Sequence, residues 1–105
     1  MPDPIVVTVS HRLGRDGARR RIDESLTQIR RQLAAFTSSL DTAWKGDRLE
    51  FSLVAMRQQI AGHLDVEESL VRIVVELPLL LRMLAGPIAR RVQGEAALLL
   101  DKPRV

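Results

Sequence analysis

Cysteine is absent from the 105-residue chain, which excludes a disulfide framework, a thiolate metal site and a cysteine nucleophile. Aromatic residues are nearly as scarce, because there is no tyrosine and the aromatic positions are only Phe36, Trp44 and Phe51. This leaves little with which to stack nucleic-acid bases. His11 and His63 have no partners at a recognisable ligand spacing, so the sequence predicts neither a metal site nor any other cofactor.

The sequence also lacks a long uncharged hydrophobic run. A membrane span needs about 20 nearly uncharged residues, and the most apolar stretch, 70–88, is interrupted by Arg72, Glu76, Arg82 and two prolines. The first four residues hold an acid and two prolines, which is unlike the basic and then apolar order of a secretory signal. We therefore expect a cytoplasmic protein without a transmembrane helix.

Size and composition indicate one ordinary folded domain over residues 1–105. The chain is 46% hydrophobic and 28% charged, with a formal net charge of +3. A domain this small has little room for a deep pocket that is walled on all sides. This counts against an enzyme.

The order of the secondary structure begins with a strand and a helix. The β-branched segment 5–10 predicts a strand. From about Arg15, apolar residues recur every three or four positions and would share one face of a helix. These positions are Ala18, Ile22, Leu26, Ile29, Leu33, Phe36 and Leu40.

A meander and a second helix complete the predicted fold. Residues 42–51 are predicted to form two strands joined by a hairpin turn at Gly46-Asp47. Alternating apolar residues extend the second of these strands over 49–55 and predict two more over 60–66 and 71–77. After Pro78 an amphipathic helix is predicted, with a kink or a break at Gly86-Pro87. The result is an α+β domain in the order β-α-β-β-β-β-α, with a mostly antiparallel sheet and both helices on one face.

Three segments carry a resemblance to a known family. They are HRLG at 11–14 with ARRRI at 18–22, WKGDRLEF at 44–51, and VRIVVELP at 71–78. Together they resemble the polyhydroxyalkanoic acid system proteins, small bacterial proteins associated with polyhydroxyalkanoate genes and granules. The resemblance implies a cellular context at the granule but no reaction and no catalytic residue. It departs from the family at 56–59, where glycine is expected in the turn.

Two apolar surfaces are candidates for a partner or for the granule. On the sheet face away from the helices, the outward apolar residues are predicted to be Val54, Met56, Ala61, Leu70 and Val74. Contiguous exposed patches of this kind commonly mark a partner, and a second copy of the chain would cover the face equally well. On the second helix, Leu98 and Leu100 widen the apolar stripe beside several arginines. The alternative is that this helix simply closes the core.

Arginines form a third candidate surface at the start of the first helix. Arg12, Arg15, Arg19 and Arg20 lie where helix amides and guanidinium groups together could hold phosphate. Interleaved acids and the absence of a groove-reading motif favour a plain solvated face.

We therefore expect a non-enzymatic accessory protein of the polyhydroxyalkanoate system that needs no cofactor and binds the granule surface or a granule-associated protein. Two alternatives stay open. One is a nucleic-acid-associated regulator that uses the arginine-rich first helix. The other is a small domain that holds an apolar ligand between helix and sheet. Dimerisation is also left open.

Overall fold

The computed structural model describes residues 4–35, 39–55 and 57–100, and within them one antiparallel sheet and the helices that cover it. The elements are β1 (Ile5–Ser10), α1 (Gly14–Leu33), β2 (Leu40–Lys45), β3 (Arg48–Ala55), β4 (Gln58–Val66), β5 (Leu70–Glu76), a short 3₁₀ helix η1 (Leu79–Leu84) and α2 (Ala85–Leu100). The predicted α+β class and the order β-α-β-β-β-β-α are confirmed.

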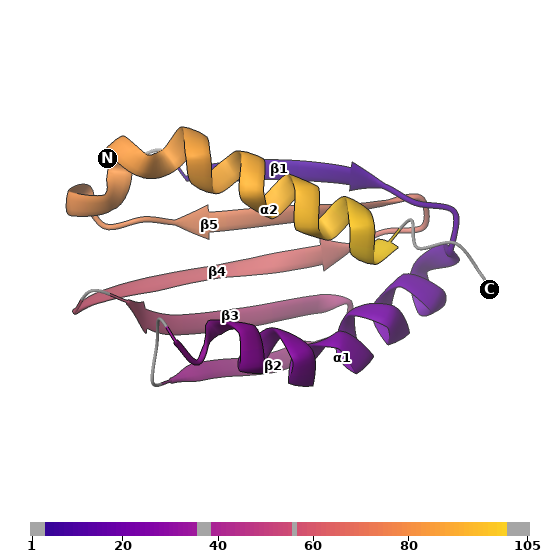
Figure 1. Ribbon diagram of the computed structural model, residues 1–105. Coiled ribbons are helices and arrows are strands. Elements are labelled where there is room, and N and C mark those ends of the chain that lie inside the picture. Colours follow the sequence, from indigo (N-terminus) through magenta and orange to yellow (C-terminus); the bar gives the residue numbers. More distant parts are fainter. Residues whose placement is uncertain (1–3, 36–38, 56, 101–105) are drawn as a thin grey trace.

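The strand order in the sheet is β1-β5-β4-β3-β2 (Figure 1). Strands β2 to β5 form a meander in which each strand pairs with the next along the chain. The first strand instead crosses to the far side and pairs with the last one, from Ile5 opposite Val75 to Ser10 opposite Leu70. Strands β1 and β2 are therefore the two edges.

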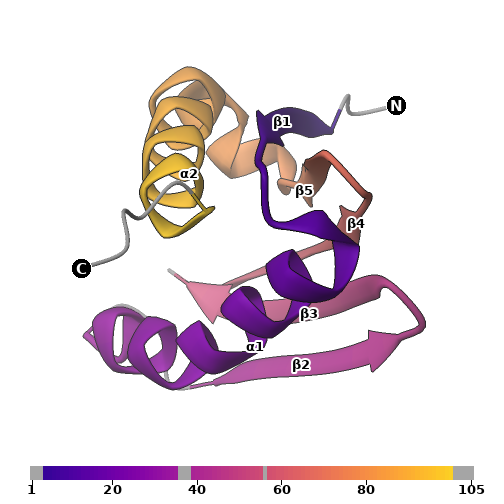
Figure 2. The ribbon, with the colours of Figure 1, turned by 90° about the vertical axis from the view of Figure 1, so that its right-hand side faces the viewer.

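Both helices cover the same face of the sheet, as predicted (Figure 2). In Figure 1, α1 lies over the β2 and β3 side, and α2 crosses obliquely over the β1 side. The side chain of Arg21 in α1 donates a hydrogen bond to the carbonyl of Leu99, 3.1 Å away, and so joins the two helices where they approach each other. Neither helix is long and apolar enough to cross a membrane.

The core lies between α2 and the β1–β5 pair. Strand β1 alternates strictly between buried and exposed residues, which is the pattern of a strand with one face in the core. The inward residues of these two strands are all buried, and they are Ile5, Val7, Val9, Val71, Ile73 and Val75. Ala18 and Ile22 add the buried face of α1.

The first helix is shorter than its apolar spacing predicts. It ends at Leu33, and Leu40 begins β2 opposite Leu53, so the expectation that Leu40 lies on the helix is wrong. The residues around Leu40 include serine, aspartate and threonine, which are weak helix formers, and the strand also gains a ladder with β3. Phe36, the other late position of the predicted stripe, lies outside the described residues.

The two hairpin turns each contain a residue with a positive φ, but the residue types differ. Gly46 has a φ of 62° in the β2–β3 turn, as the hairpin prediction requires. In the β3–β4 turn, where the sequence lacks the expected glycine, Arg57 takes the left-handed conformation with a φ of 63°. A side chain in that region costs about 1–2 kcal/mol relative to glycine.

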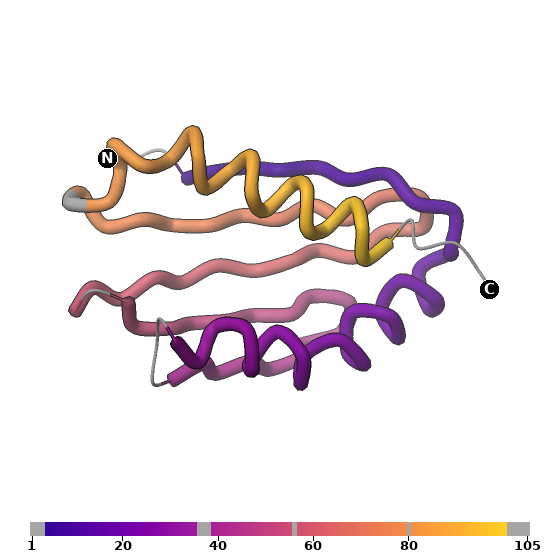
Figure 3. Tube along the Cα trace, viewed as in Figure 1, coloured from indigo at the N-terminus to yellow at the C-terminus, as the bar shows by residue number. Residues whose placement is uncertain are grey.

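The predicted break near Gly86-Pro87 is confirmed as a change of helix type. The 3₁₀ helix η1 ends at Leu84 and α2 starts at Ala85, so Pro87 falls in the first turn of α2. A proline there has no intrahelical hydrogen bond to remove. The chain therefore turns a corner between β5 and α2 and exposes η1 at that corner (Figure 3).

Candidate functional site

The outer face of the sheet, away from the helices, is crossed by charged side chains. Arg48 and Asp65 are cross-strand neighbours on β3 and β4, and Arg48 Nε donates to Asp65 Oδ1 at 2.7 Å. This hydrogen bond raises the pKa of Arg48 above its ordinary value. On the adjacent strand, Arg72 lies 3.5 Å from a carboxylate oxygen of Glu67. Exposed pairs of this kind add little stability but keep the face hydrated.

The outward apolar residues that the sequence predicted lie on both sides of this charged row. Val54, Ala61 and Val74 lie toward the β3–β4 turn, and Leu70 lies on the other side of Arg72. Val54 is 42% exposed, whereas Ala61, Leu70 and Val74 are only partly exposed. Leu70 is opposite Ser10, at the other end of the sheet from Val54. Met56 lies outside the described residues. The described members of the set therefore do not form one continuous apolar patch.

A larger apolar surface lies on the helical layer, at the corner between β5 and α2. It is formed by Leu79, Met83 and Leu84, which are 78%, 85% and 41% exposed. We call these three residues the η1–α2 surface. Leu98, predicted as a surface residue, is 72% exposed but lies near the other end of α2, about 20 Å along the helix from Leu84. Leu79 and Met83 were not singled out. The signal that could have revealed them is the apolar run after Pro78, which is wider than one helical stripe.

Leu100 does not belong to this surface. Its side chain is 3% exposed and packs in the core with the inward residues of β1 and β5. The helix geometry explains the difference, because positions 98 and 100 are separated by about 200° around the axis of an α-helix and therefore point to opposite sides. The alternative that α2 closes the core therefore holds for Leu100, while Leu98 faces outward.

The arginine cluster is divided between structural contacts and solvent. Arg15 Nε lies 3.5 Å from Asp47 Oδ2 in the β2–β3 turn. The guanidinium of Arg19 stacks on the indole of Trp44, 4.5 Å from the ring centroid. Arg12 and Arg20 are exposed. Two of the four predicted anion-binding arginines thus fasten α1 to the β2–β3 hairpin.

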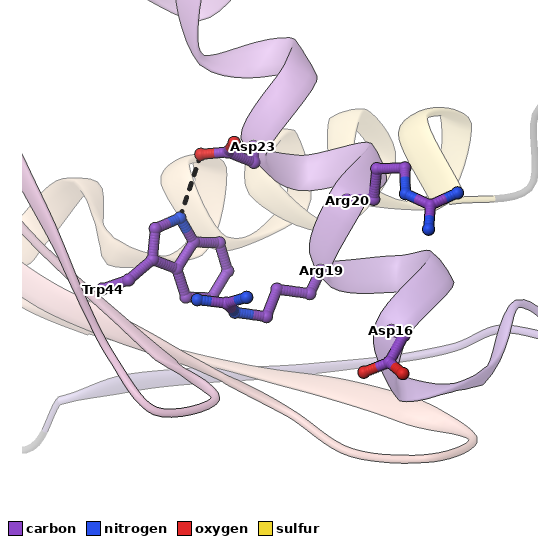
Figure 4. A pocket seen from close by; sticks show the side chains of 5 residues that line it. All are labelled: Asp16, Arg19, Arg20, Asp23 and Trp44. Atoms are coloured by element: carbon purple, nitrogen blue, oxygen red, sulfur yellow. Dashed lines mark hydrogen bonds between the residues drawn. The ribbon is translucent and has the colours of Figure 1, made fainter.

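A pocket of about 370 Å³ lies beside this contact (Figure 4). Its lining residues are Asp16, Arg19, Arg20, Asp23 and Trp44. Trp44 Nε1 donates to Asp23 Oδ1 at 3.0 Å. The indole therefore contacts α1 twice, through Arg19 on its ring face and through Asp23 at its N–H. The two aspartates offset the two arginines. The lining is therefore neither strongly basic nor the apolar cavity that a small-ligand domain would need.

His11 is a structural residue at the junction between β1 and α1. Its ring Nε2 donates to the carbonyl of Glu67 at 3.1 Å, and its Nδ1 accepts from the N–H of Leu13 at 3.1 Å. The side chain is 8% exposed. Among the described residues, no group of three or more histidines and carboxylates is placed to hold a metal ion.

Comparison with known proteins identifies the family. Residues 5–100 match the family model described as "Putative polyhydroxyalkanoic acid system protein". The chain belongs to this family. No match to a curated protein or to a solved structure was found.

The segments that carried the resemblance to the polyhydroxyalkanoic acid system family hold the fold together. His11 fastens β1 to the β4–β5 turn, and Trp44 fastens the first hairpin to α1. Leu77 is 7% exposed at the end of β5, just before the chain turns into η1. Residues with such partners are expected in a family signature for stability alone. The candidate functional surface must therefore be sought elsewhere in this family member, and the η1–α2 surface is the most exposed apolar one.

Proposed function

We propose that this protein is a non-enzymatic accessory protein of the polyhydroxyalkanoate system, which works in the cytoplasm by binding the surface of the polymer granule. The family supplies the polyhydroxyalkanoate context. The η1–α2 surface is the proposed contact with the polymer. A granule-associated protein is the alternative partner, and the experiment below separates the two.

The observation that carries the proposal is the exposure of large apolar side chains at one corner. Of the six that are exposed in the described part of the chain, three belong to the η1–α2 surface. Leu79 and Met83 keep 78% and 85% of their surface in water. Burying such a side chain in an apolar phase is worth about 1.5–3 kcal/mol. Protruding side chains on a short helix can enter a polyester surface without needing a preformed groove.

Charge near this surface suits the edge of a coated granule. Arg90 and Arg91 are exposed on α2, and Glu95 is the one acid between residues 79 and 100. Arg91 Nε lies 3.5 Å from a carboxylate oxygen of Glu95, so Arg90 remains to face an anionic coat. Exposed charges are screened by salt. The apolar side chains therefore supply most of the expected affinity.

The outer face of the sheet is the weaker candidate for the same role. It carries the Arg48–Asp65 and Arg72–Glu67 pairs, which separate Leu70 from Val54, Ala61 and Val74. Laying this face on a polymer would strip water from those charges, which costs more than the apolar residues return. Val54, which with Val6 is one of two exposed large apolar residues of this face, offers a matched control.

The test is co-sedimentation of the purified full chain with washed polyhydroxyalkanoate particles. We expect the wild-type protein to pellet with the particles and to remain bound when salt is raised. The double variant Leu79→Ser, Met83→Ser should bind more than tenfold more weakly, since it removes about 3 kcal/mol or more of apolar burial. Both side chains are exposed, so circular dichroism should show an unchanged fold.

The control variant is Val54→Ser, which alters an exposed apolar residue on the opposite face and should leave binding unchanged. Wild-type protein that stays in solution, while an established granule coat protein pellets in the same assay, would overturn direct polymer binding. If Val54→Ser loses binding while the double variant keeps it, the contact lies on the outer face of the sheet instead.

A further inference from the structure

The edge of the sheet at β1 carries unused backbone groups. The N–H of His11 donates to the carbonyl of Ser69 at 2.9 Å, which fixes the alternation along the strand. The backbone N–H and C=O groups of Val9, Val7 and Ile5 therefore bond to β5. The backbone groups of the residues between them point away from β5. The N–H and C=O groups of Val6, Thr8 and Ser10 thus point out from the sheet.

Within Ile5–Ser10 this edge carries no charge, proline or bulge that would prevent strand pairing. The exposed residues of this segment include Val6, 55% exposed. Natural sheets protect their edges with charges, prolines, bulges or a covering segment. In the described part of the chain no strand lies beyond β1. The edge is therefore open to a further strand.

The other edge, β2, is protected. The guanidinium of Arg30 donates to the carbonyl of Leu40, and its Nη2 donates to Thr42 Oγ1 at 2.9 Å. Asp41 and Lys45 place charges of both signs on the same short strand. The difference between the two edges indicates that β1 in particular is built to accept a partner.

We propose that β1 pairs with β1 of a second copy of this chain, in an antiparallel arrangement centred on Thr8. Val6 then lies opposite the partner's Ser10, and Thr8 lies opposite the partner's Thr8. Each of the three outward residues contributes one N–H and one C=O, so all of these groups in both strands are satisfied at once.

The chemistry of the strand favours a second copy over an unrelated strand. A two-fold axis through Thr8 brings identical residues together, and a charged strand would then meet its own charge. β1 is neutral throughout, so no such repulsion arises. Threonine opposite threonine is also a favourable cross-strand pair. The oblique course of α2 carries that helix away from the β1 edge toward its C-terminal end (Figure 1).

The symmetry of this dimer has a consequence for the granule. An antiparallel pair of edge strands requires a two-fold axis perpendicular to the sheet, so both helical layers lie on the same side of a ten-stranded sheet. The two η1–α2 surfaces would then face the polymer together and bind with higher avidity. This consequence rests on the proposed function, whereas the dimer itself does not.

The test is light scattering coupled to size-exclusion chromatography of the full chain, without any polymer. We expect a mass of twice 11.8 kDa for the wild type. In the Thr8→Glu variant, each new carboxylate faces Arg72 within its own copy but meets a second carboxylate across the axis. The dimer dissociation constant should rise about tenfold or more. Thr8→Val, which adds no charge, should remain dimeric.

Charge reversal supplies a control against misfolding. A mixture of the Thr8→Glu and Thr8→Lys variants should form the dimer that neither variant forms well alone. A wild-type mass of 11.8 kDa at the highest soluble concentration would overturn the proposal, and so would a Thr8→Glu variant that dimerises as tightly as the wild type. Failure to bind polymer leaves these masses unchanged, so the two proposals fail separately.

Discussion

Replacing Gly62 by alanine tests how closely the β4 backbone packs against its neighbours in the sheet. Gly62 lies near the middle of β4, opposite Phe51 on β3 and Val75 on β5. A Cβ added there would lie 2.2 Å from the carbonyl oxygen of Val74 and 2.6 Å from Cζ of Phe51. The ring can move, but the carbonyl belongs to the β5 backbone. The strand itself must therefore shift.

The expected cost follows from that contact. Overpacking in a well-filled core costs about 1–3 kcal/mol, and the backbone contact places Gly62→Ala at the upper part of this range. For a domain of this size, a loss of about 2–3 kcal/mol lowers the thermal midpoint by roughly 10–20 °C. Thermal unfolding followed by circular dichroism measures it directly.

Gly94→Ala is the matched control. Gly94 is exposed within α2, and an added Cβ meets nothing within 4 Å. Alanine there should raise stability by about 0.5–1 kcal/mol, because glycine is a poor residue inside a helix. If Gly62→Ala melts within about 2 °C of the wild type, the reasoning is refuted, since such a shift corresponds to well under 1 kcal/mol.

Two further substitutions test local contacts. Arg57→Gly should raise the free energy of unfolding by about 1 kcal/mol, because glycine takes the left-handed conformation of the β3–β4 turn without strain; a lower urea midpoint than the wild type would contradict this. His11→Ala should lower it by about 1–3 kcal/mol, since the carbonyl of Glu67 and the N–H of Leu13 lose their partner. An unchanged urea midpoint would show that water replaces the ring without cost.

Much of the fold followed from the sequence because its periodicities are strong. The alternation in β1 and β5, the glycine at Gly46 and the break before Pro87 each have a local physical cause. The end of α1 did not follow, since Leu40 continues the helical spacing by coincidence and only the ladder to Leu53 shows that it is a strand residue. The weak helix formers around Leu40 favour an end to the helix, but tertiary pairing decided where the strand begins, and the apolar spacing does not reveal it.

The candidate site was less predictable than the fold. Alternation placed Val54, Val74 and Leu70 on the outer face, but it could not show that the ion pairs of Arg48 and Arg72 separate Leu70 from the other two. Those pairs depend on the register between strands. Leu79 and Met83 are exposed because a 3₁₀ helix turns the corner after β5. A switch of helix type changes which residues face outward, and the spacing of apolar residues does not encode it.

The pairing of the first strand with the last also governs the order of events during synthesis. Ile5 finds its partner Val75 only after 70 further residues have been made. The meander of β2 to β5 contains mostly local contacts, so it can form first, while β1 has no strand to join. A nascent chain thus carries a neutral, β-branched segment exposed for most of its translation. Such a segment is prone to premature association, and its rapid capture by β5 is the step on which the yield of folded protein depends.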